Sequence, residues 1–305
     1  MQSVSAKNLT KTYGVKKKVV AVDNISFSVN NGEIFGLIGP DGAGKTTVFR
    51  MLTTLLLPDA GSGTVAGFDV AKDYQQIRSS VGYMPGRFSL YPDLTVEENL
   101  TFFATIFGTT IQQNYSLIRE IYVQLEPFKN RRAGKLSGGM KQKLALCCAL
   151  IHKPIVLFLD EPTTGVDPVS RKEFWEMLKR LKAQGITILV STPYMDEAGL
   201  CDRIALMQNG KILMLDTPAN ISNSYPEKLL AVKANKMSTL LKSLSDFPAV
   251  LNSYAFGEYA HAVLQNDETD IENQMKKYLE HEGLANIEIK PTKATIEDSF
   301  IKLLK

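Results

Sequence analysis

The chain has 305 residues, enough for a full-sized core and a second, smaller domain, and its 44% hydrophobic and 22% charged residues exclude a disordered or fibrous protein. Lys and Arg outnumber Asp and Glu by only 35 to 32, which argues against a strongly basic nucleic-acid-binding protein. Three irregularly spaced cysteines exclude a disulfide framework and a zinc site, so we expect a reduced, cytosolic protein. No run approaches the roughly 18 apolar residues of a membrane span.

The first predicted elements are strands. Apolar and polar residues alternate from 25 to 30, the period of a half-buried strand. Almost wholly apolar runs follow at residues 33–39, 155–160 and 186–191, as in strands that are covered on both faces. Because helical patterns separate these runs, we expect an α/β fold built on a parallel sheet.

The segment GPDGAGKTT follows the first apolar run and leads into a helical pattern, which is the context of a phosphate-binding P-loop. Its glycines allow backbone N–H groups to converge on phosphate oxygens, Lys45 supplies charge for the β and γ phosphates, and Thr46 offers Mg²⁺ a hydroxyl ligand. A chance glycine-rich turn is the weaker alternative. The predicted site comprises Gly39, Pro40, Asp41, Gly42, Ala43, Gly44, Lys45, Thr46 and Thr47.

A long insertion between the first two core strands reads as mostly helical. Thr95 and Glu98 have the spacing of a capping box. Apolar residues follow at helical intervals, namely Leu100, Phe103, Ile106 and Phe107. We therefore predict a helical subdomain from about residue 92 to about residue 140.

The segment LSGGMKQK runs into an apolar helix, which places Ser137, Gly138 and Gly139 at a helix N-terminus. Such an end can bind an anion. One chain seldom needs two such ends for one triphosphate, so this end is expected to address a nucleotide held by another subunit. An ordinary helix cap is the alternative.

The second apolar run delivers Asp160 to the edge of the sheet that carries the P-loop, with Glu161 next to it. We expect Asp160 to hold the Mg²⁺ shell and Glu161 to polarise an attacking water. The third run continues as VSTPYMDEAG, where Pro193 has no N–H and no proton to exchange.

The character of the chain changes after residue 218. A polar stretch, ANISNSYPE, precedes segments that read β, α, β, β, α, β and α. The first six have the order of a split βαβ, ferredoxin-like unit. We expect a first domain over residues 1–222 and a small α+β accessory domain over residues 226–305.

Together, GPDGAGKTT, VLFLDE and LSGGMKQK closely resemble the Walker A, Walker B and signature motifs of the ATP-binding cassette (ABC) ATPases, and the resemblance covers the whole chain. It implies a RecA-like P-loop core with an antiparallel β subdomain and a helical subdomain, and ATP with Mg²⁺ as cofactors. Tyr13 matches the aromatic residue that stacks on adenine, with a packed tyrosine as the alternative. Asp167 matches the D-loop that communicates across a dimer.

The tail TIEDSFIKLL resembles the accessory domain of ABC-2 type exporters, and STPYMDEA resembles one half of the tandem-cassette multidrug exporter ATPases. The resemblance implies a head-to-tail dimer that clamps two ATP molecules, each between one P-loop and the other Ser-Gly-Gly. Closure would drive a separate ABC-2 type permease, with this subunit at the cytoplasmic face of the membrane. The insertion would carry the docking surface, with residues 88–91 near the coupling helices or, equally, as a buried loop anchor.

Two positions depart from the family pattern. Gly86 stands where the Q-loop glutamine belongs, and Pro193 stands where the switch histidine belongs. No histidine lies nearby in sequence, and Arg87 and Tyr194 are the local candidates to replace it. Loss of one donor to transition-state charge slows catalysis by roughly a hundredfold to a thousandfold, so we expect retained ATP binding, slow hydrolysis and a degenerate site in a heterodimer.

Three alternatives remain open. The chain could form a fully active homodimer in which other groups replace the missing pair. A soluble ABC protein that acts on ribosomes or DNA is disfavoured, because such proteins usually carry two cassettes or a long coiled coil. A regulatory module that only clamps ATP is disfavoured by the retained Glu161. Cargo specificity resides largely in the membrane subunits of this family, so this sequence does not identify the cargo.

Overall fold

The computed structural model describes residues 2–14, 16–87, 89–265 and 270–304, and the chain divides into two compact units at Pro218–Ala219. This division comes slightly earlier than the boundary expected near residues 222–226. The reason is local, because the short helix α8 (Pro218–Asn223) belongs mostly to the second unit. Within that unit Ile221 is fully buried, and its carbonyl accepts a hydrogen bond from Ser299 at 3.3 Å.

The first unit contains a four-stranded antiparallel sheet. Its strands run in the order β2-β1-β4-β5, with bounds β1 Gln2–Tyr13, β2 Val19–Asn30, β4 Ala60–Val65 and β5 Phe68–Asp69. The alternation of residues 25–30 thus belongs to the end of β2. This sheet packs over α1 (Lys45–Leu52). Val4 and Val22 from the sheet and Phe49 from α1 belong to one buried core.

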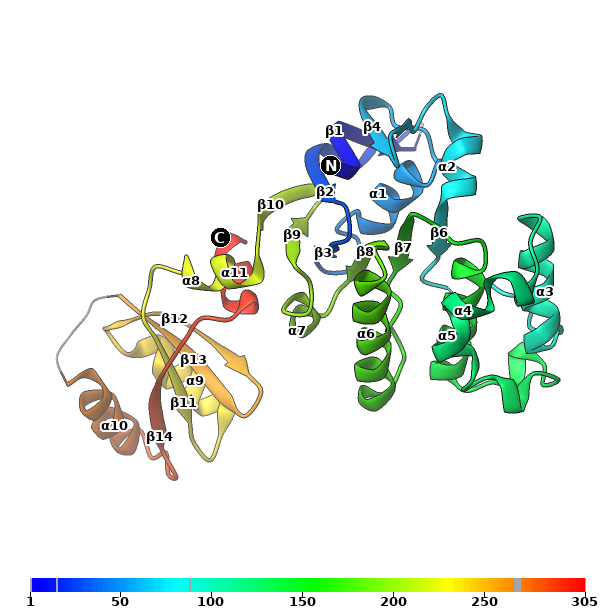
Figure 1. Ribbon diagram of the computed structural model, residues 1–305. Helices are drawn as coiled ribbons and strands as arrows, with labels where there is room; N and C mark the ends of the chain where they lie inside the picture. The colour runs from blue at the N-terminus through cyan, green and yellow to red at the C-terminus, as the bar shows by residue number, and fades with distance from the viewer. Residues whose placement is uncertain (1, 15, 88, 266–269, 305) are drawn as a thin grey trace. The chain divides into compact units, whose positions relative to one another are not determined.

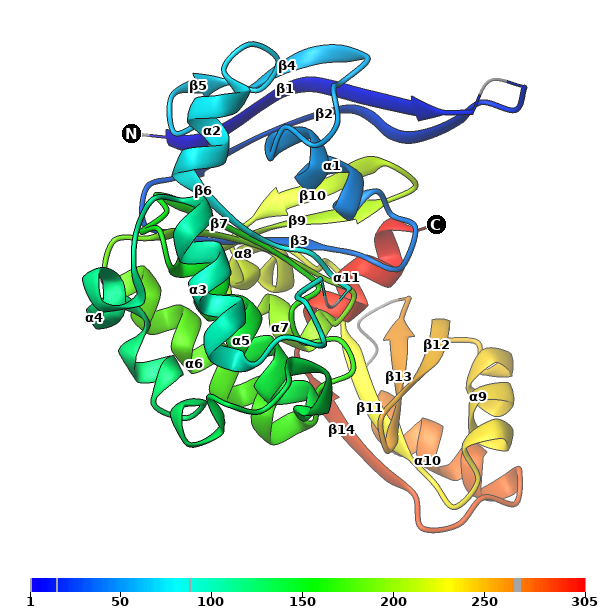
Figure 2. The ribbon, with the colours of Figure 1, turned by 90° about the vertical axis from the view of Figure 1, so that its right-hand side faces the viewer.

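A six-stranded sheet forms the centre of the first unit, in the order β10-β9-β3-β8-β7-β6. All of its pairs are parallel except β9 with β10, and the parallel sheet predicted from the apolar runs is confirmed. Figure 2 shows α1 on one side of this sheet and α5 and α6 on the other, which explains why β3, β7 and β8 are buried throughout. The strand bounds are β3 Ile34–Ile38, β6 Val81–Met84, β7 Val156–Asp160, β8 Thr187–Thr192, β9 Arg203–Gln208 and β10 Lys211–Asp216.

The insertion is helical, as the sequence predicts. Helix α3 begins with the expected capping box, in which the Glu98 N–H donates to Thr95 Oγ1 at 3.2 Å and the Thr95 N–H donates to Glu98 Oε2 at 2.8 Å. Leu100 is fully buried, but Ile106, expected on the same apolar face, is 59% exposed because it borders an open groove. Helices of this unit are α2 Tyr74–Ser80, α3 Val96–Ile106, α4 Ile111–Tyr122, α5 Gly138–Leu150, α6 Pro168–Ala183 and α7 Met195–Ala198, with short 3-10 turns at Glu126–Phe128 and Ala133–Lys135.

The second unit is a four-stranded antiparallel sheet with helices, in the strand order β12-β13-β11-β14 (Figure 1). This is the topology of a split βαβ unit. Helices α9 and α10 share a core with the sheet through Leu240, Met275 and Val232. The elements follow one another as β11 Leu229–Lys233, α9 Met237–Asp246, β12 Val250–Phe256, β13 Tyr259–Leu264, α10 Ile271–His281, β14 Glu288–Thr292 and α11 Ile296–Leu303.

A buried carboxylate fastens α11 to this sheet. Asp298 is fully buried, and its Oδ1 lies 2.7 Å from His261 Nδ1 and accepts a hydrogen bond from the Tyr254 hydroxyl at 2.6 Å. Thr295 donates to the other oxygen through its N–H and its hydroxyl. Burial opposes the ionisation of Asp298, but the hydrogen bonds from His261, Tyr254 and Thr295 outweigh it and lower the pKa of the carboxyl to about 2.

We predict that Asp298→Asn destabilises the second unit by about 1–3 kcal/mol at neutral pH, because donors are left unsatisfied. Since the folded-state pKa lies below the unfolded value of 3.8, the carboxylate stabilises above pH 3.8 and this stabilisation is lost as the pH falls towards 2. Hydrogen exchange of the α11 and β13 amides measures the effect. Asp246→Asn, at an exposed position, is the control. Equal protection in Asp298→Asn and the parent at pH 7 would contradict this role.

Candidate functional site

The loop between β3 and α1 has a backbone that requires glycine. Gly42 and Gly44 have φ values of 80° and 103°, in the left-handed region where other side chains are strained. A Cβ at Gly39 would collide with the Met207 carbonyl oxygen. Gly44 occupies the N-cap position of α1 without a side-chain cap, so the first N–H groups of this helix are left for a ligand.

Lys45 is held within this loop. Its side chain is 3% exposed, and Nζ donates to the carbonyl oxygens of Gly39 at 2.7 Å and Pro40 at 3.0 Å. The same ammonium lies 3.3 Å from the Glu161 carboxylate. A positive charge is therefore fixed between the loop backbone and the first residue after β7.

A carboxylate and a hydroxyl meet at the end of β7. Thr46 Oγ1 donates to Asp160 Oδ1 at 3.1 Å, and Asp160 is 2% exposed. Such hard oxygen ligands are those that Mg²⁺ prefers, and this cation usually takes only one or two carboxylates alongside phosphates and water. The described part of the chain holds no group of three or more His, Cys, Asp and Glu side chains placed to bind a metal.

Glu161 reaches the site through an unusual backbone. Its φ is 50°, and its N–H donates to both the carbonyl oxygen and the Oγ of Ser191 at 3.0 Å. Its side chain is 23% exposed and points to Lys45. The left-handed conformation thus places this carboxylate beside the P-loop rather than along the strand.

Most of these groups line one cavity of about 260 Å³, whereas Asp160 does not line it. The lining residues that the sequence predicts are Asp41, Gly42, Ala43, Gly44, Lys45, Thr46, Thr47 and Glu161. Gly39 and Pro40 lie under Lys45 instead. Ala21, from β2, also lines the cavity and carried no signal in the sequence.

Tyr13 lies at the end of β1 next to this loop, with its hydroxyl 3.5 Å from Thr47 Oγ1. Its side chain is 39% exposed, so it is not a packed core tyrosine. An aromatic face beside the P-loop is therefore open to solvent.

The signature residues do not line this cavity. Ser137 caps α5 by accepting from the Met140 N–H at 3.4 Å, and Ser137 and Gly138 are exposed. Asp167 caps α6 by accepting from the N–H groups of Val169 at 3.1 Å and Ser170 at 3.0 Å. The hydrogen bond from the Ser170 N–H is the main cause that lowers the pKa of Asp167. In this single chain both motifs are helix caps.

Of the two departures from the family pattern, Gly86 lies close to the acidic residues, and Pro193 directly follows β8. A Cβ at Gly86 would be 3.1 Å from the Asp160 carbonyl oxygen, so the missing glutamine would have started beside β7. Of the two local candidates to replace the missing histidine, Tyr194 has the Arg171 guanidinium of α6 over its ring, 4.3 Å from the centroid. The other candidate, Arg87, is exposed and borders a separate groove.

A buried carboxylate that the sequence analysis missed organises the turn after β8. Glu197 is 2% exposed and accepts from Thr163 Oγ1 at 2.7 Å, Thr192 Oγ1 at 2.6 Å and Arg171 Nε at 3.1 Å. These donors come from the loop after β7, from β8 and from α6. Only the acidic run in MDEA hinted at it, since Thr163 and Arg171 are distant from Glu197 in the sequence.

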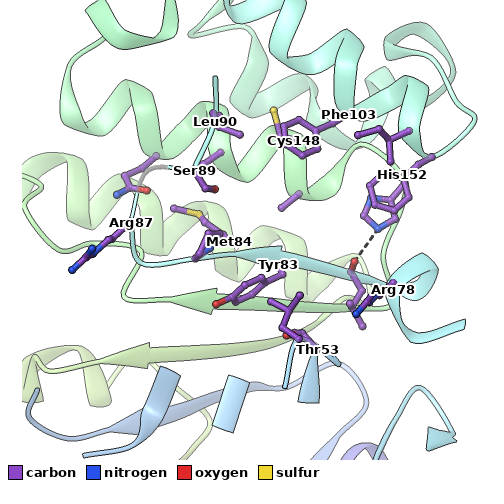
Figure 3. A pocket seen from close by; sticks show the side chains of 18 residues that line it. Thr53, Arg78, Tyr83, Met84, Arg87, Ser89, Leu90, Phe103, Cys148 and His152 are labelled. Atoms are coloured by element: carbon purple, nitrogen blue, oxygen red, sulfur yellow. Dashed lines mark hydrogen bonds between the residues drawn. The ribbon is translucent and has the colours of Figure 1, made fainter. Parts of the chain in front are cut away.

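The separate groove, here called the β6–α5 groove, has a volume of about 420 Å³ and is lined by Tyr83, Met84, Leu90, Phe103, Cys148 and His152 among others (Figure 3). His152 Nε2 lies 3.0 Å from the Val81 carbonyl oxygen, and its ring stacks on Phe107. Burial lowers the pKa of His152, so this side chain is uncharged at pH 7.

The structure describes only part of the segment 88–91. Phe88 lies outside the described residues, whereas Leu90 is buried and Tyr91 is 46% exposed.

A family model described as ABC transporter matches residues 22–164 of the chain. The Nod factor export ATP-binding protein I of Burkholderia lata is 40% identical over 248 residues, which cover 80% of this chain and 81% of that protein. This chain belongs to the ABC transporter ATP-binding family. Another ABC relative, the probable multidrug ABC transporter ATP-binding protein YbhF of Escherichia coli, is 40% identical over 291 residues. That match covers 93% of this chain and 49% of YbhF, so the chain spans about half the length of this relative.

Solved ABC cassettes share the fold of the first unit. The structure of an ATP-binding subunit of an ABC transporter is 28% identical, with a TM-score of 0.66 over 73% of this chain and 92% of that chain. A dimeric ATP-binding cassette in a post-hydrolysis state, bound to ADP and Pi, is 25% identical, with a TM-score of 0.64 over 70% of this chain and 98% of that chain. The resemblance inferred from the three motifs is confirmed.

We predict that Glu197→Gln lowers the free energy of unfolding by about 1–3 kcal/mol, because the partly buried Arg171 guanidinium loses its buried carboxylate partner. Denaturant unfolding followed by fluorescence of Trp175, the single tryptophan, which lies on α6, measures this loss. The matched control is Glu176→Gln, which removes an exposed pair with Lys179 on the same helix and should cost less than about 1 kcal/mol. Equal losses in the two variants would show that the Glu197 cluster contributes no special stability.

Proposed function

We propose that this chain binds ATP with Mg²⁺ and hydrolyses it slowly to drive export through a separate membrane subunit. The observation that carries the proposal is the meeting of Lys45, Glu161 and the Thr46–Asp160 pair at one end of the parallel sheet. Lys45 and the N–H groups of the loop would bind the phosphates, and Tyr13 would stack on adenine. Thr46 and Asp160 would hold Mg²⁺, which neutralises charge on the β and γ phosphates when bound.

Glu161 is the group that would accept a proton from the attacking water. Lys45 lies 3.3 Å from this carboxylate, so entry of a γ-phosphate would give the ammonium a second negative partner. The slow rate follows from the absence of a glutamine at Gly86 and a histidine at Pro193, each worth about a hundredfold to a thousandfold. The positions of Tyr194 and Arg87 support this, because Tyr194 lies against the Arg171 guanidinium and Arg87 borders a separate groove.

The proposed assembly is a dimer of cassettes. Ser137 and Gly138 are exposed at the N-terminus of α5 and do not line the chain's own cavity, which suits a role in completing the site of a second cassette. The dimeric relative bound to ADP and Pi supports this arrangement. Because both departures belong to the half of the site built around this chain's own P-loop in the family pattern, while its signature is intact, we favour a heterodimer over a homodimer.

The proposed membrane partner is an ABC-2 type permease that docks at the β6–α5 groove. No helix among the described residues is long and apolar enough to cross a membrane. The groove is open and largely apolar, and Ile106 at its border is 59% exposed. The names of the relatives, a multidrug transporter protein and a Nod factor export protein, support export as the direction. The chain would then lie at the inner face of the membrane, bound through the permease.

We predict that the purified chain alone binds ATP but hydrolyses it at least about a hundredfold more slowly than its mixture with the second cassette encoded beside it. In that mixture Gly138→Asp in this chain should abolish the rate, because it blocks the partner's site. Glu161→Gln in this chain should lower the hydrolysis rate of the mixture far less. A steady-state phosphate-release assay measures each rate. A fast rate for the chain alone, abolished by Glu161→Gln, would instead identify a fully active homodimer.

We predict that Ile106→Glu weakens binding to the permease by about tenfold or more, because a charge would be buried against an apolar partner surface. Co-purification with the polytopic membrane protein encoded by an adjacent reading frame, in nanodiscs, measures the binding. Val123→Glu is the matched control, since this side chain is 48% exposed at the end of α4 and does not line the groove. ATP binding should be unchanged in both variants. Equal binding of both variants to the permease would place the docking surface elsewhere.

A further inference from the structure

Ser191 lies at the carboxyl end of β8, directly beside Asp160 of β7. The two residues are register partners in the parallel pair, so their side chains leave the same face of the sheet. Ser191 is fully buried. It therefore lies next to the proposed metal carboxylate, although the two positions are distant in the sequence.

The Ser191 hydroxyl connects both acidic residues. Oγ lies 2.5 Å from Asp160 Oδ1 and 3.0 Å from the Glu161 backbone nitrogen. An ionised carboxylate has no proton to give, and an amide N–H cannot accept one, so the hydroxyl donates to Asp160 and accepts from Glu161. Its single proton is thereby used, and its orientation is fixed.

These bonds constrain the Asp160 carboxylate. Asp160 Oδ1 accepts from Ser191 on one strand and from Thr46 on the P-loop helix, at 2.5 Å and 3.1 Å. Two hydroxyls on one oxygen resist rotation of the carboxylate about its Cβ–Cγ bond. A buried carboxylate also needs such donors, because a polar group buried without hydrogen bonds costs free energy.

The same hydroxyl supports the backbone of Glu161. A non-glycine residue in the left-handed conformation is strained, and it persists only when its surroundings hold it. At Glu161, with φ 50°, the N–H is held by both Ser191 oxygens. The direction in which Glu161 projects its side chain towards Lys45 therefore depends on Ser191.

We propose that Ser191 is a positioning residue that orients Asp160 towards Mg²⁺ and Glu161 towards the attacking water, in a site that lacks the usual glutamine and histidine. The inference rests on the proposed ATP-binding function. The simpler alternative is a serine that only satisfies a buried N–H group. Under that alternative, loss of the Ser191 hydroxyl would lower stability but would not change the Mg²⁺ concentration that nucleotide binding requires.

The test measures how much Mg²⁺ is needed for half-maximal binding of a fluorescent ATP analogue, by anisotropy, in the full chain carrying Glu161→Gln to prevent turnover. Ser191→Ala should raise this Mg²⁺ concentration about 10- to 100-fold, the typical effect of removing a hydrogen-bond partner of a metal ligand. Binding of the analogue in EDTA should be unchanged. Ser191→Thr, which keeps a hydroxyl, should restore the Mg²⁺ requirement of the parent.

Thr187→Val is the matched control, because it removes another buried hydroxyl from β8 at the opposite end of the strand, where it meets Ser3 and Gly32. This variant should lose stability and keep the Mg²⁺ requirement. If Ser191→Ala does not fold, Ser191→Cys, with its weaker donor, should show a smaller rise of the same sign. An unchanged Mg²⁺ requirement in a folded Ser191 variant without a hydroxyl, or an equal rise in Thr187→Val, would overturn the proposal. A parent that binds no analogue at any Mg²⁺ concentration would overturn the proposed function as well.

Discussion

The hydrogen bond from Thr46 to Asp160 joins the start of α1 to the end of β7, and the rest of the site is arranged around it. It forms because β3, β8 and β7 are parallel neighbours, so the segments that follow them leave the sheet at the same edge. Burial of the three strands on both faces fixes their register. The fixed register determines where the strands end, and thereby the positions of Lys45, Glu161 and Ser191. An edge of this kind concentrates charge and hydrogen-bond donors where a triphosphate would bind.

Against this intact frame, the two departures are local. Gly86 and Pro193 each remove a side chain, yet neither disturbs the backbone around Asp160, since β6 and β8 keep their pairing with β7. The turn after β8 is held instead by Glu197 with Thr163, Thr192 and Arg171. In the proposed function, holding a nucleotide and turning it over depend on different groups. The first would need the loop, Lys45 and Thr46, which are present, and the second would need donors to the transition state, two of which the family pattern places at positions 86 and 193.

The second unit uses the same kind of interaction for a structural purpose. Asp298 caps its own helix together with Thr295 and also accepts from His261 and Tyr254 of the sheet. One carboxylate thus satisfies a helix end and several side chains at once, and its burial makes each bond more important. The motif TIEDSF is recognisable in the sequence, but its role as a fastening between α11 and the sheet is visible only when β12 and β13 are placed beside it.

The sequence by itself determined the elements and motifs whose signals are local: the apolar runs of β3, β7 and β8, the capping box at Thr95, the P-loop and the two departures at Gly86 and Pro193. Local chemistry suffices there, because glycine spacing, strand period and helix caps each depend on a few consecutive residues. Tertiary structure decided which distant groups meet. The bridge from Ser191 to Asp160, the Glu197 cluster and the contact of Tyr194 with Arg171 join segments far apart in the chain. The exposure of Ile106 likewise depends on how the helices pack. Strand order and helix packing create such contacts, and no periodicity along one segment encodes them.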